Sequence, residues 1–239
     1  MSLVINRMLT AKHLGGPGFR QIQGIILHDT AGSGKHNDTL YLANPGDGRT
    51  VSVDFTVERD GTVYQLNPDL KNKWCYHAGR NTYFKGQRNA AVNKAALGIE
   101  IVQKADMSLV PVWPEAQVMS VARLCVKLCS DFNLKKEDIA THAQVITDGS
   151  RSDPRKFPFN QFWKFFEMAA LEYNSALKSS GSAEPEVTGG KIYHEVRNGD
   201  TLYGIAVKYH TTIEKVKALN NMETPSTLIT VGQKLLVKE

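Results

Sequence analysis

The sequence has 239 residues, 41% of them hydrophobic, and 29 lysines and arginines against 24 aspartates and glutamates give a formal net charge of +5. This apolar fraction supports a folded core, and no stretch approaches the roughly 20 apolar residues of a membrane-spanning helix. Three cysteines are too few for a disulfide scaffold, and their odd number leaves at least one thiol unpaired. The composition therefore excludes a chain that is disordered throughout, a membrane-inserted protein and a disulfide-rich miniprotein.

The positive charge is spread thinly along the chain, without a dense basic run. Such an excess fits a nucleic acid, an anionic membrane surface or an acidic polymer such as a bacterial wall. The first residues, Met1 to Arg7, lack the basic start, apolar stretch and cleavage site of a secretory signal. We therefore expect synthesis in the cytoplasm, with export only if a native signal has been removed.

The composition changes at residues 178–191, where serine, glycine, proline and glutamate dominate and Val187 is the one sizeable apolar residue. Such a stretch cannot bury enough apolar surface to offset the entropy lost on ordering. We predict a flexible linker at 178–191 that joins a domain at 1–177 to a small domain at 192–239.

Three apolar patterns predict strands in the larger domain. Residues 24–28 form a short apolar run typical of a buried strand. Residues 51–58 and 63–66 flank the turn signal Asp60-Gly61, which predicts a hairpin. Residues 96–102 are again almost wholly apolar and predict a third strand.

Two amphipathic segments follow, at 114–132 and 160–177, and each places apolar residues on one helical face. Strands mixed with helices predict an α/β domain with a mixed central β-sheet flanked by helices.

Polar residues stand at the ends of these strands or within them. His28 ends the first strand, Glu100 interrupts an apolar strand, and His142 and Asp153 flank a loop. Two histidines and a carboxylate with a fourth position open are the ligand count of a catalytic zinc ion. A satisfied structural histidine is the competing interpretation for each histidine alone. A purely structural interpretation is harder to accept for Glu100, because burying a carboxylate without a partner costs several kcal/mol of free energy.

Six motifs in chain order carry a family resemblance. They are Ile25 to Ala31, Phe55 to Leu66, His77 to Gly79, Leu97 to Glu100, His142, and Arg151 to Pro154. Together they resemble the motifs of the zinc-dependent N-acetylmuramoyl-L-alanine amidases of the type-2 family, which share their fold with peptidoglycan recognition proteins and T7-type lysozyme. The resemblance covers roughly residues 20–170. It implies hydrolysis of the amide bond between N-acetylmuramic acid and the L-alanine of the stem peptide.

The resemblance also implies residue roles. It makes His28, His142 and Asp153 the Zn²⁺ ligands and Glu100 the general base. Arg151 stands where the family usually has an oxyanion-stabilising lysine; it keeps the positive charge, although an arginine differs from a lysine in shape and cannot lend a proton.

Two of these assignments have competing interpretations. For Arg151 the alternative is a salt bridge to Asp148 or Asp153. His77 resembles a substrate-contacting residue of the cleft rim, and ordinary hydrogen bonding within its loop is the alternative.

The sequence departs from its relatives at two further positions. Asp54 replaces a histidine found in many members, and we interpret it as a surface or supporting carboxylate. Val53 stands where T7-type enzymes have a tyrosine, which disfavours a tyrosine-assisted mechanism.

The three cysteines have no ligand or base partners in the sequence. Cys125 and Cys129, one helical turn apart, are expected to be small buried residues, and Cys75 a free thiol that is not a nucleophile.

The sequence of the small domain predicts the order strand, helix, helix, strand. Asp200 or Thr201 is the expected cap of the first helix and Thr212 that of the second. Val196 to Ala206, Ile213 to Asn220 and Gly232 to Leu235 together resemble a LysM module, a small α+β domain with βααβ order. The resemblance implies binding of N-acetylglucosamine-containing glycans, with Gly199, Asp200, Thr201 and Leu202 as substrate-binding residues beside a groove completed by residues 221–229. An interaction domain without a glycan is the alternative.

The two parts together indicate a peptidoglycan hydrolase that a LysM module targets to the cell wall, either a phage endolysin released at lysis or a bacterial autolysin. The alternatives are a non-catalytic peptidoglycan recognition protein and a cytoplasmic muropeptide-recycling amidase. We expect a monomer whose partners are the muramoyl-peptide and the glycan of peptidoglycan, with neither nucleic acid nor membrane insertion.

Overall fold

The computed structural model describes residues 3–180, 186–188, 191–197, 200, 202–209, 211–222 and 229–238. The chain divides into two compact units, Met1–Tyr173 and Asn174–Glu239. Among the described residues, no helix has both the length and the apolar character needed to cross a membrane.

The first unit is built on a six-stranded sheet, as predicted. The strand order is β1-β4-β3-β7-β2-β8, and only the β3–β4 pair is antiparallel. The strands are β1 (Ile5–Asn6), β2 (Gly24–Asp29), β3 (Phe55–Val57), β4 (Val63–Gln65), β7 (Ala96–Ile101) and β8 (Ile139–Thr141). The predicted hairpin is β3–β4, and the two apolar runs are the adjacent central strands β2 and β7.

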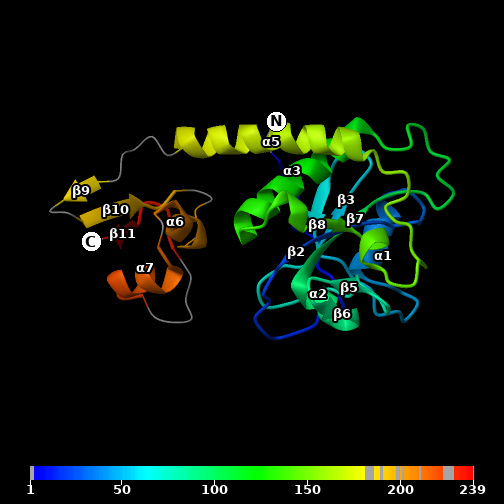
Figure 1. Ribbon diagram of the computed structural model, residues 1–239, viewed down its shortest axis with the longest axis horizontal. Helices are drawn as coiled ribbons and strands as arrows, with labels where there is room; N and C mark the ends of the chain where they lie inside the picture. The colour runs from blue at the N-terminus through cyan, green and yellow to red at the C-terminus, as the bar shows by residue number, and fades with distance from the viewer. Residues whose placement is uncertain are drawn as a thin grey trace. The chain divides into compact units, whose positions relative to one another are not determined.

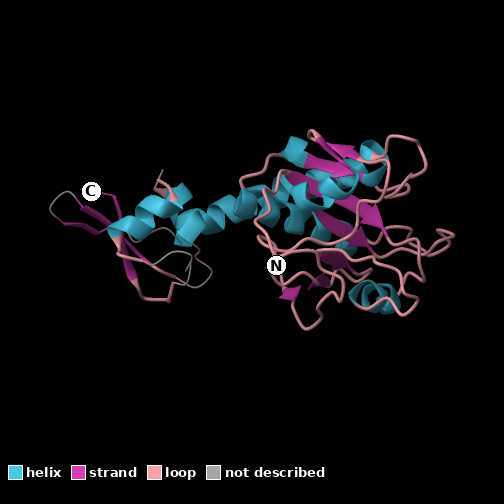
Figure 2. Ribbon diagram, turned by 90° about the horizontal axis from the view of Figure 1, so that it is seen from below, coloured by secondary structure: helices cyan, strands magenta, loops and turns pink. Residues whose placement is uncertain are grey.

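The helices lie on both sides of this sheet (Figures 1 and 2). The two predicted amphipathic helices are α3 (Glu115–Phe132) and α5 (Phe159–Ser180). The shorter elements are α1 (His36–Ala43), α2 (Val92–Ala95), α4 (His142–Val145), the 3₁₀ turns η1 (Asn89–Ala91) and η2 (Lys136–Asp138), and the small pair β5 (Tyr83–Phe84) and β6 (Gln87–Arg88).

The two faces of the central strands differ in chemistry, because side chains alternate along a strand. Leu27 and Ile99 point to the face that α3 and α5 cover, within the main apolar core. His28 and Glu100, one residue further along, point to the opposite face. Figure 1 shows α2, β5 and β6 beyond that second face. The main core is thus on one side of the sheet, and the polar candidate residues are on the other.

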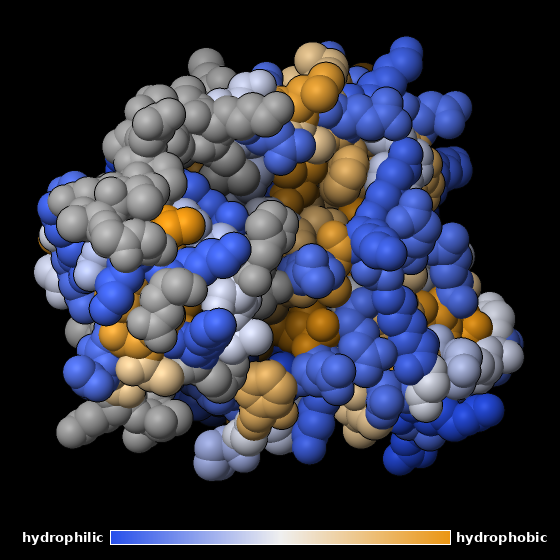
Figure 3. Space-filling view, turned by 60° about the vertical axis from the view of Figure 1, so that its left-hand side comes forward, coloured by the Kyte–Doolittle hydropathy of each residue, from blue (hydrophilic) through white to orange (hydrophobic). Residues whose placement is uncertain are grey.

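The surface carries scattered exposed apolar side chains, a normal feature of folded proteins. On the face drawn in Figure 3, apolar groups lie between hydrophilic ones. The large apolar residues with the greatest exposure are Val110, Met8, Phe19 and Val4.

The second unit has the predicted order of strand, helix, helix and strand, preceded by a further strand. Its elements are β9 (Glu186–Thr188), β10 (Lys191–Glu195), α6 (Leu202–Lys208), α7 (Ile213–Leu219) and β11 (Lys234–Lys238), and the sheet order is β11-β10-β9. The side chain of Thr212 caps α7 by accepting from the amide of Lys215. Asn220 joins α7 to β11, since its side chain bonds Leu236 N and O at 2.8 and 2.7 Å.

The stretch 178–191, predicted as a flexible linker, contains regular structure at both ends. Helix α5 continues to Ser180, and β9 pairs with β10 in antiparallel register. Serine is tolerated in a helix, so its abundance did not mark where the helix ends. The domain limits at 177 and 192 stay predictions.

Candidate metal centre and active site

One row of polar side chains crosses the sheet on the face opposite the main core. His28 of β2 pairs with Glu100 of β7, and Glu100 pairs with Thr56 of β3. Register partners on neighbouring strands point to the same face. His142 directly follows the last residue of β8, where Thr141 pairs with Leu27, so it lies next to His28.

His28, His142 and Asp153 converge as predicted, and their ligand atoms all lie within 4.8 Å of one another. Nδ1 of His28 lies 3.0 Å from Nδ1 of His142, and Oδ2 of Asp153 lies 3.4 Å from Nδ1 of His28 and 3.0 Å from Nδ1 of His142. Ligands about 2.0–2.1 Å from a tetrahedral zinc ion stand about 3.3 Å apart. Both the donor set and its spacing therefore fit a tetrahedral metal ion with one position open.

The protonation states of the cluster also suit a metal. Burial raises the pKa of Asp153, but the hydrogen bonds and charges of His142 and His28 together outweigh it, so that the pKa lies below its ordinary value. Burial lowers the pKa of His28. A carboxylate and a neutral imidazole are the forms that bind a metal.

Glu100 stands next to this cluster without a partner of its own. Its Oε2 is buried and has no hydrogen bond in the described part of the chain. Burial, reinforced by Asp153 and Asp29, raises the pKa of Glu100 to about 8. A structural carboxylate would be paired, so this arrangement indicates a group that exchanges protons.

Arg151 is exposed and, within the described ranges, makes no ion pair with Asp148 or Asp153. The salt-bridge alternative therefore has no support. Its guanidinium still acts on the site, because its positive charge lowers the pKa of both Glu100 and His28.

His77 does not lie at a cleft rim, where we expected it. The residue is 8% exposed, and its Nδ1 lies 3.1 Å from Nε2 of His28, behind the candidate metal cluster. Burial, reinforced by the proximity of His28, lowers the pKa of His77 to about 3. The loop turns inward here because Gly98 leaves room on β7: a Cβ at Gly98 would lie 2.5 Å from Cγ of His77.

Asp54 is fully buried, and the surface position that we considered for it is wrong. Arg20 pairs with it at 3.0 Å, and Asn67 Nδ2 and the amide of Gly98 donate to it at 2.7 and 2.9 Å. Burial raises its pKa, but the charge of Arg20, the proximity of His77 and the hydrogen bonds from Asn67 and Gly98 together outweigh burial and hold the pKa below its ordinary value. Asp54 thus supports the loop and strand behind the site. Val53 is also buried.

Sequence reasoning missed the ion pair between Asp29 and Arg155. The Asp29 carboxylate accepts from Arg155 N, Nε and Nη2, at 2.7, 3.0 and 2.5 Å. Asp29 follows His28, and Arg155 lies two residues after Asp153, so the pair joins the segments that carry two candidate metal ligands. The signal available in the sequence was an acidic residue directly after His28 and a basic residue two positions after Asp153.

The three cysteines are free and buried, as expected. Burial raises the pKa of each thiol, which disfavours the reactive thiolate.

Two of the four predicted glycan-binding residues can be placed. Asp200 Oδ2 accepts from the amide of Arg197 at 2.8 Å and lies 2.7 Å from Nε2 of His194. Leu202 belongs to the small unit's apolar core and is 2% exposed, so its side chain is unavailable to a ligand. Gly199 and Thr201 lie outside the described residues.

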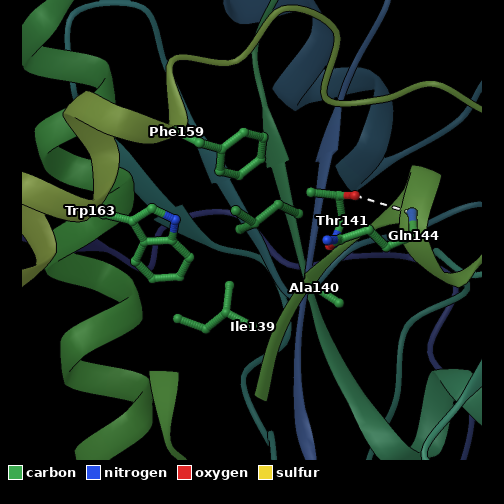
Figure 4. Close-up of a pocket in the computed structure, with 7 residues that line it drawn as sticks. Ile139, Ala140, Thr141, Gln144, Phe159 and Trp163 are labelled. Carbon is green, nitrogen blue, oxygen red and sulfur yellow. Dashed lines mark hydrogen bonds between the residues drawn. The ribbon is translucent and has the colours of Figure 1, made fainter. Parts of the chain in front are cut away.

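A hollow of about 360 Å³ lies beside the edge strand β8, away from the metal ligands. Figure 4 shows Ile139, Phe159 and Trp163 around it, with Thr141 bonded to Gln144 on its far side. Leu27, which lines it, points to the main-core face, whereas His28 points to the other. This hollow is therefore separate from the candidate metal centre.

The comparisons with known proteins agree with this geometry. Residues 18–156 match the Amidase_2 family, described as N-acetylmuramoyl-L-alanine amidase, and residues 194–238 match the LysM domain. The N-acetylmuramoyl-L-alanine amidase XlyA of Bacillus subtilis (strain 168) is 30% identical over 217 residues, covering 89% of this chain and 60% of that protein. The chain thus spans about 60% of the length of this curated relative.

Solved structures show the same fold. The catalytic domain of XlyA has a TM-score of 0.51 at 24% identity, covering 68% of this chain and 99% of that one. PlyL has a TM-score of 0.52 at 17% identity, covering 70% and 96%. With its family match and its metal-ligand cluster, the chain belongs to the N-acetylmuramoyl-L-alanine amidase family and carries a LysM domain.

Proposed function

We propose that the first unit hydrolyses the amide bond between the lactyl group of N-acetylmuramic acid and the L-alanine of the stem peptide, with Zn²⁺ as its metal. The observation that carries this proposal is the convergence of His28, His142 and Asp153 beside the unpartnered carboxylate of Glu100. Family membership supports the choice of bond. When bound, zinc would polarise the scissile carbonyl and lower the pKa of its water.

Different side chains carry out proton transfer, charge stabilisation and positioning. Glu100 takes the proton of the attacking water at its unpartnered Oε2 and then delivers it to the leaving amine of L-alanine. Arg151 supplies positive charge near the oxygen that becomes negative in the transition state. The Asp29–Arg155 pair holds the segment of Asp153 against the end of β2.

The LysM unit binds the N-acetylglucosamine-containing glycan in this proposal. A weak glycan site joined to the catalytic unit raises the effective concentration of substrate at the active site. The protein acts on the cell wall as a monomer, in the manner of a phage endolysin. The modest net charge of +5 favours an anionic wall, and its effect should decline as salt is raised.

The test uses the full chain and compares Glu100→Gln with Glu137→Gln, since Glu137 is exposed at η2, away from the metal ligands. A soluble muramoyl-peptide serves as the substrate, and release of new amines is measured together with bound zinc. We expect Glu100→Gln to keep its zinc and lose at least about 100-fold in kcat, whereas Glu137→Gln matches the unaltered protein. Full activity of Glu100→Gln, or activity that survives complete removal of the metal, would contradict the proposal. Unaltered protein that binds the substrate without cleaving it would favour a recognition protein.

A further inference from the structure

Nε2 of His28, which points away from the candidate metal cluster, is hydrogen-bonded to His77. Nδ1 of His28 lies among the ligand atoms, whereas Nε2 lies 3.1 Å from Nδ1 of His77. The two rings meet edge to face with centroids 5.2 Å apart. His77 therefore touches a metal ligand from behind.

The hydrogen bond at Nε2 of His77 shows which ring nitrogens of His77 and His28 carry a hydrogen. Nε2 of His77 lies 3.1 Å from the carbonyl oxygen of Ala96, which can only accept a hydrogen bond. His77 Nε2 must therefore carry the hydrogen, and Nδ1 of a neutral ring is then an acceptor. It follows that His28 donates from Nε2, and a neutral His28 ring then has its lone pair on Nδ1, directed into the cluster.

Rigid parts hold the His77 ring in this position. Asn93 Oδ1 accepts from the amides of His77 and Ala78, at 3.0 and 2.7 Å. On the sheet side, Gly98 allows the ring to lie against β7, where any Cβ would clash with it. The Ala96 carbonyl is itself fixed, because Arg20 also donates to it at 2.7 Å.

The other histidine ligand lacks such a support. Nε2 of His142 is buried and has no hydrogen-bond partner among the described residues. The two histidines thus differ in how the nitrogen that faces away from the cluster is held: among the described residues, only that of His28 has a side-chain partner.

We propose that His77 is a positioning residue that fixes the tautomer and ring orientation of His28 for metal binding through Nδ1. This inference rests on the proposed metal site at His28, His142 and Asp153. Partners behind a metal-bound histidine typically change metal affinity 10- to 100-fold when removed. His77 is not a catalytic residue in this account, because it is buried behind the ligand and does not reach the substrate.

The test compares His77→Leu with His77→Asn in the full chain. Leucine and asparagine have nearly the same branched shape, but only asparagine can accept from His28 Nε2. Zinc affinity is measured by competition with a chromophoric chelator, and the melting temperature of the metal-free protein is measured beside it. We expect His77→Leu to bind zinc about 10- to 100-fold more weakly than the unaltered protein, and His77→Asn to recover most of this loss. The two variants should melt at similar temperatures without metal.

His36 offers a matched control, because its side chain is 48% exposed and pairs with Glu58 rather than with a ligand. His36→Leu should leave zinc affinity unchanged. Equal zinc affinity in His77→Leu, His77→Asn and the unaltered protein would overturn the role of His77. Failure of the unaltered protein to bind zinc would instead overturn the proposed function itself.

A second measurement needs no variant. In ¹⁵N-labelled, zinc-loaded protein, the imidazole correlations of His28 should show a hydrogen on Nε2 and the metal on Nδ1. A hydrogen on Nδ1, or metal bound through Nε2, would overturn the proposal even if both His77 variants failed to fold.

Discussion

The ion pair between Asp29 and Arg155 allows a quantitative stability prediction. The Asp29 side chain is fully buried, and the Arg155 side chain is 24% exposed. Arg155 donates to this carboxylate from its backbone amide and its guanidinium, and the amide of Ala31 donates as well. Arg155→Met keeps a long side chain but leaves a buried carboxylate without its cation.

The expected size of the effect follows from the burial of the pair. Removal of one partner of a buried ion pair costs about 3–5 kcal/mol, and the partial exposure of Arg155 places this change near the lower end. We expect Arg155→Met to lower the free energy of unfolding by about 3 kcal/mol, or the melting temperature by about 6–12 °C for a unit of this size. Asp29→Asn in the same chain removes the stranded charge, so the double variant should lose only about 1–2 kcal/mol.

Urea unfolding followed by tryptophan fluorescence measures this directly. All three tryptophans, Trp74, Trp113 and Trp163, lie in the first unit, so the signal reports on that unit alone. A loss of less than about 1 kcal/mol in Arg155→Met, or a loss in the double variant equal to the sum of the two single variants, would refute this role of the ion pair.

The remaining predictions concern three other supports of the fold. The pKa of Asp54 lies below its ordinary value of 3.8, because the charge of Arg20, the proximity of His77 and two hydrogen bonds together outweigh burial. The contribution of Asp54 to stability is therefore present above about pH 4 and disappears as the pH falls through the lowered pKa. Asp54→Asn should flatten the acid side of the stability curve, and an unchanged curve would contradict this. Gly98→Ala places a Cβ 2.5 Å from the His77 ring, so it should weaken zinc binding in the chelator competition more than it lowers the melting temperature. In the second unit, Asn220→Ala removes three side-chain bonds to α7 and β11 and should destabilise that unit by about 2–3 kcal/mol, measured by hydrogen exchange of the β11 amides, with the first unit unaffected.

The sequence predicted those strands and helices whose hydrophobic pattern is long enough to be recognised. The apolar runs of β2 and β7 and the 18-residue helix α3 have clear periodicity. Strands β1 and β8, of two and three residues, were not predicted, because such short strands form only through pairing with neighbours that are distant in sequence.

The sequence predicted that the candidate ligands come together, but it did not predict how the residues behind them are arranged. His28, His142, Asp153 and Glu100 come together because strand ends meet at one edge of a parallel sheet. His77 was misplaced because spacing along a chain does not show whether a loop turns inward. Gly98, a glycine inside a buried strand, was the available signal, since such a glycine often marks a close approach.

The central claim is amide hydrolysis at the metal cluster, and the direct measurement is the chemical identity of the ends created in purified peptidoglycan. The unaltered zinc-loaded protein should release new amino termini that labelling identifies as L-alanine, without new reducing sugar ends. His142→Ala, which removes one proposed ligand, should release neither. New reducing ends without new L-alanine termini would contradict the account and indicate a glycosidase.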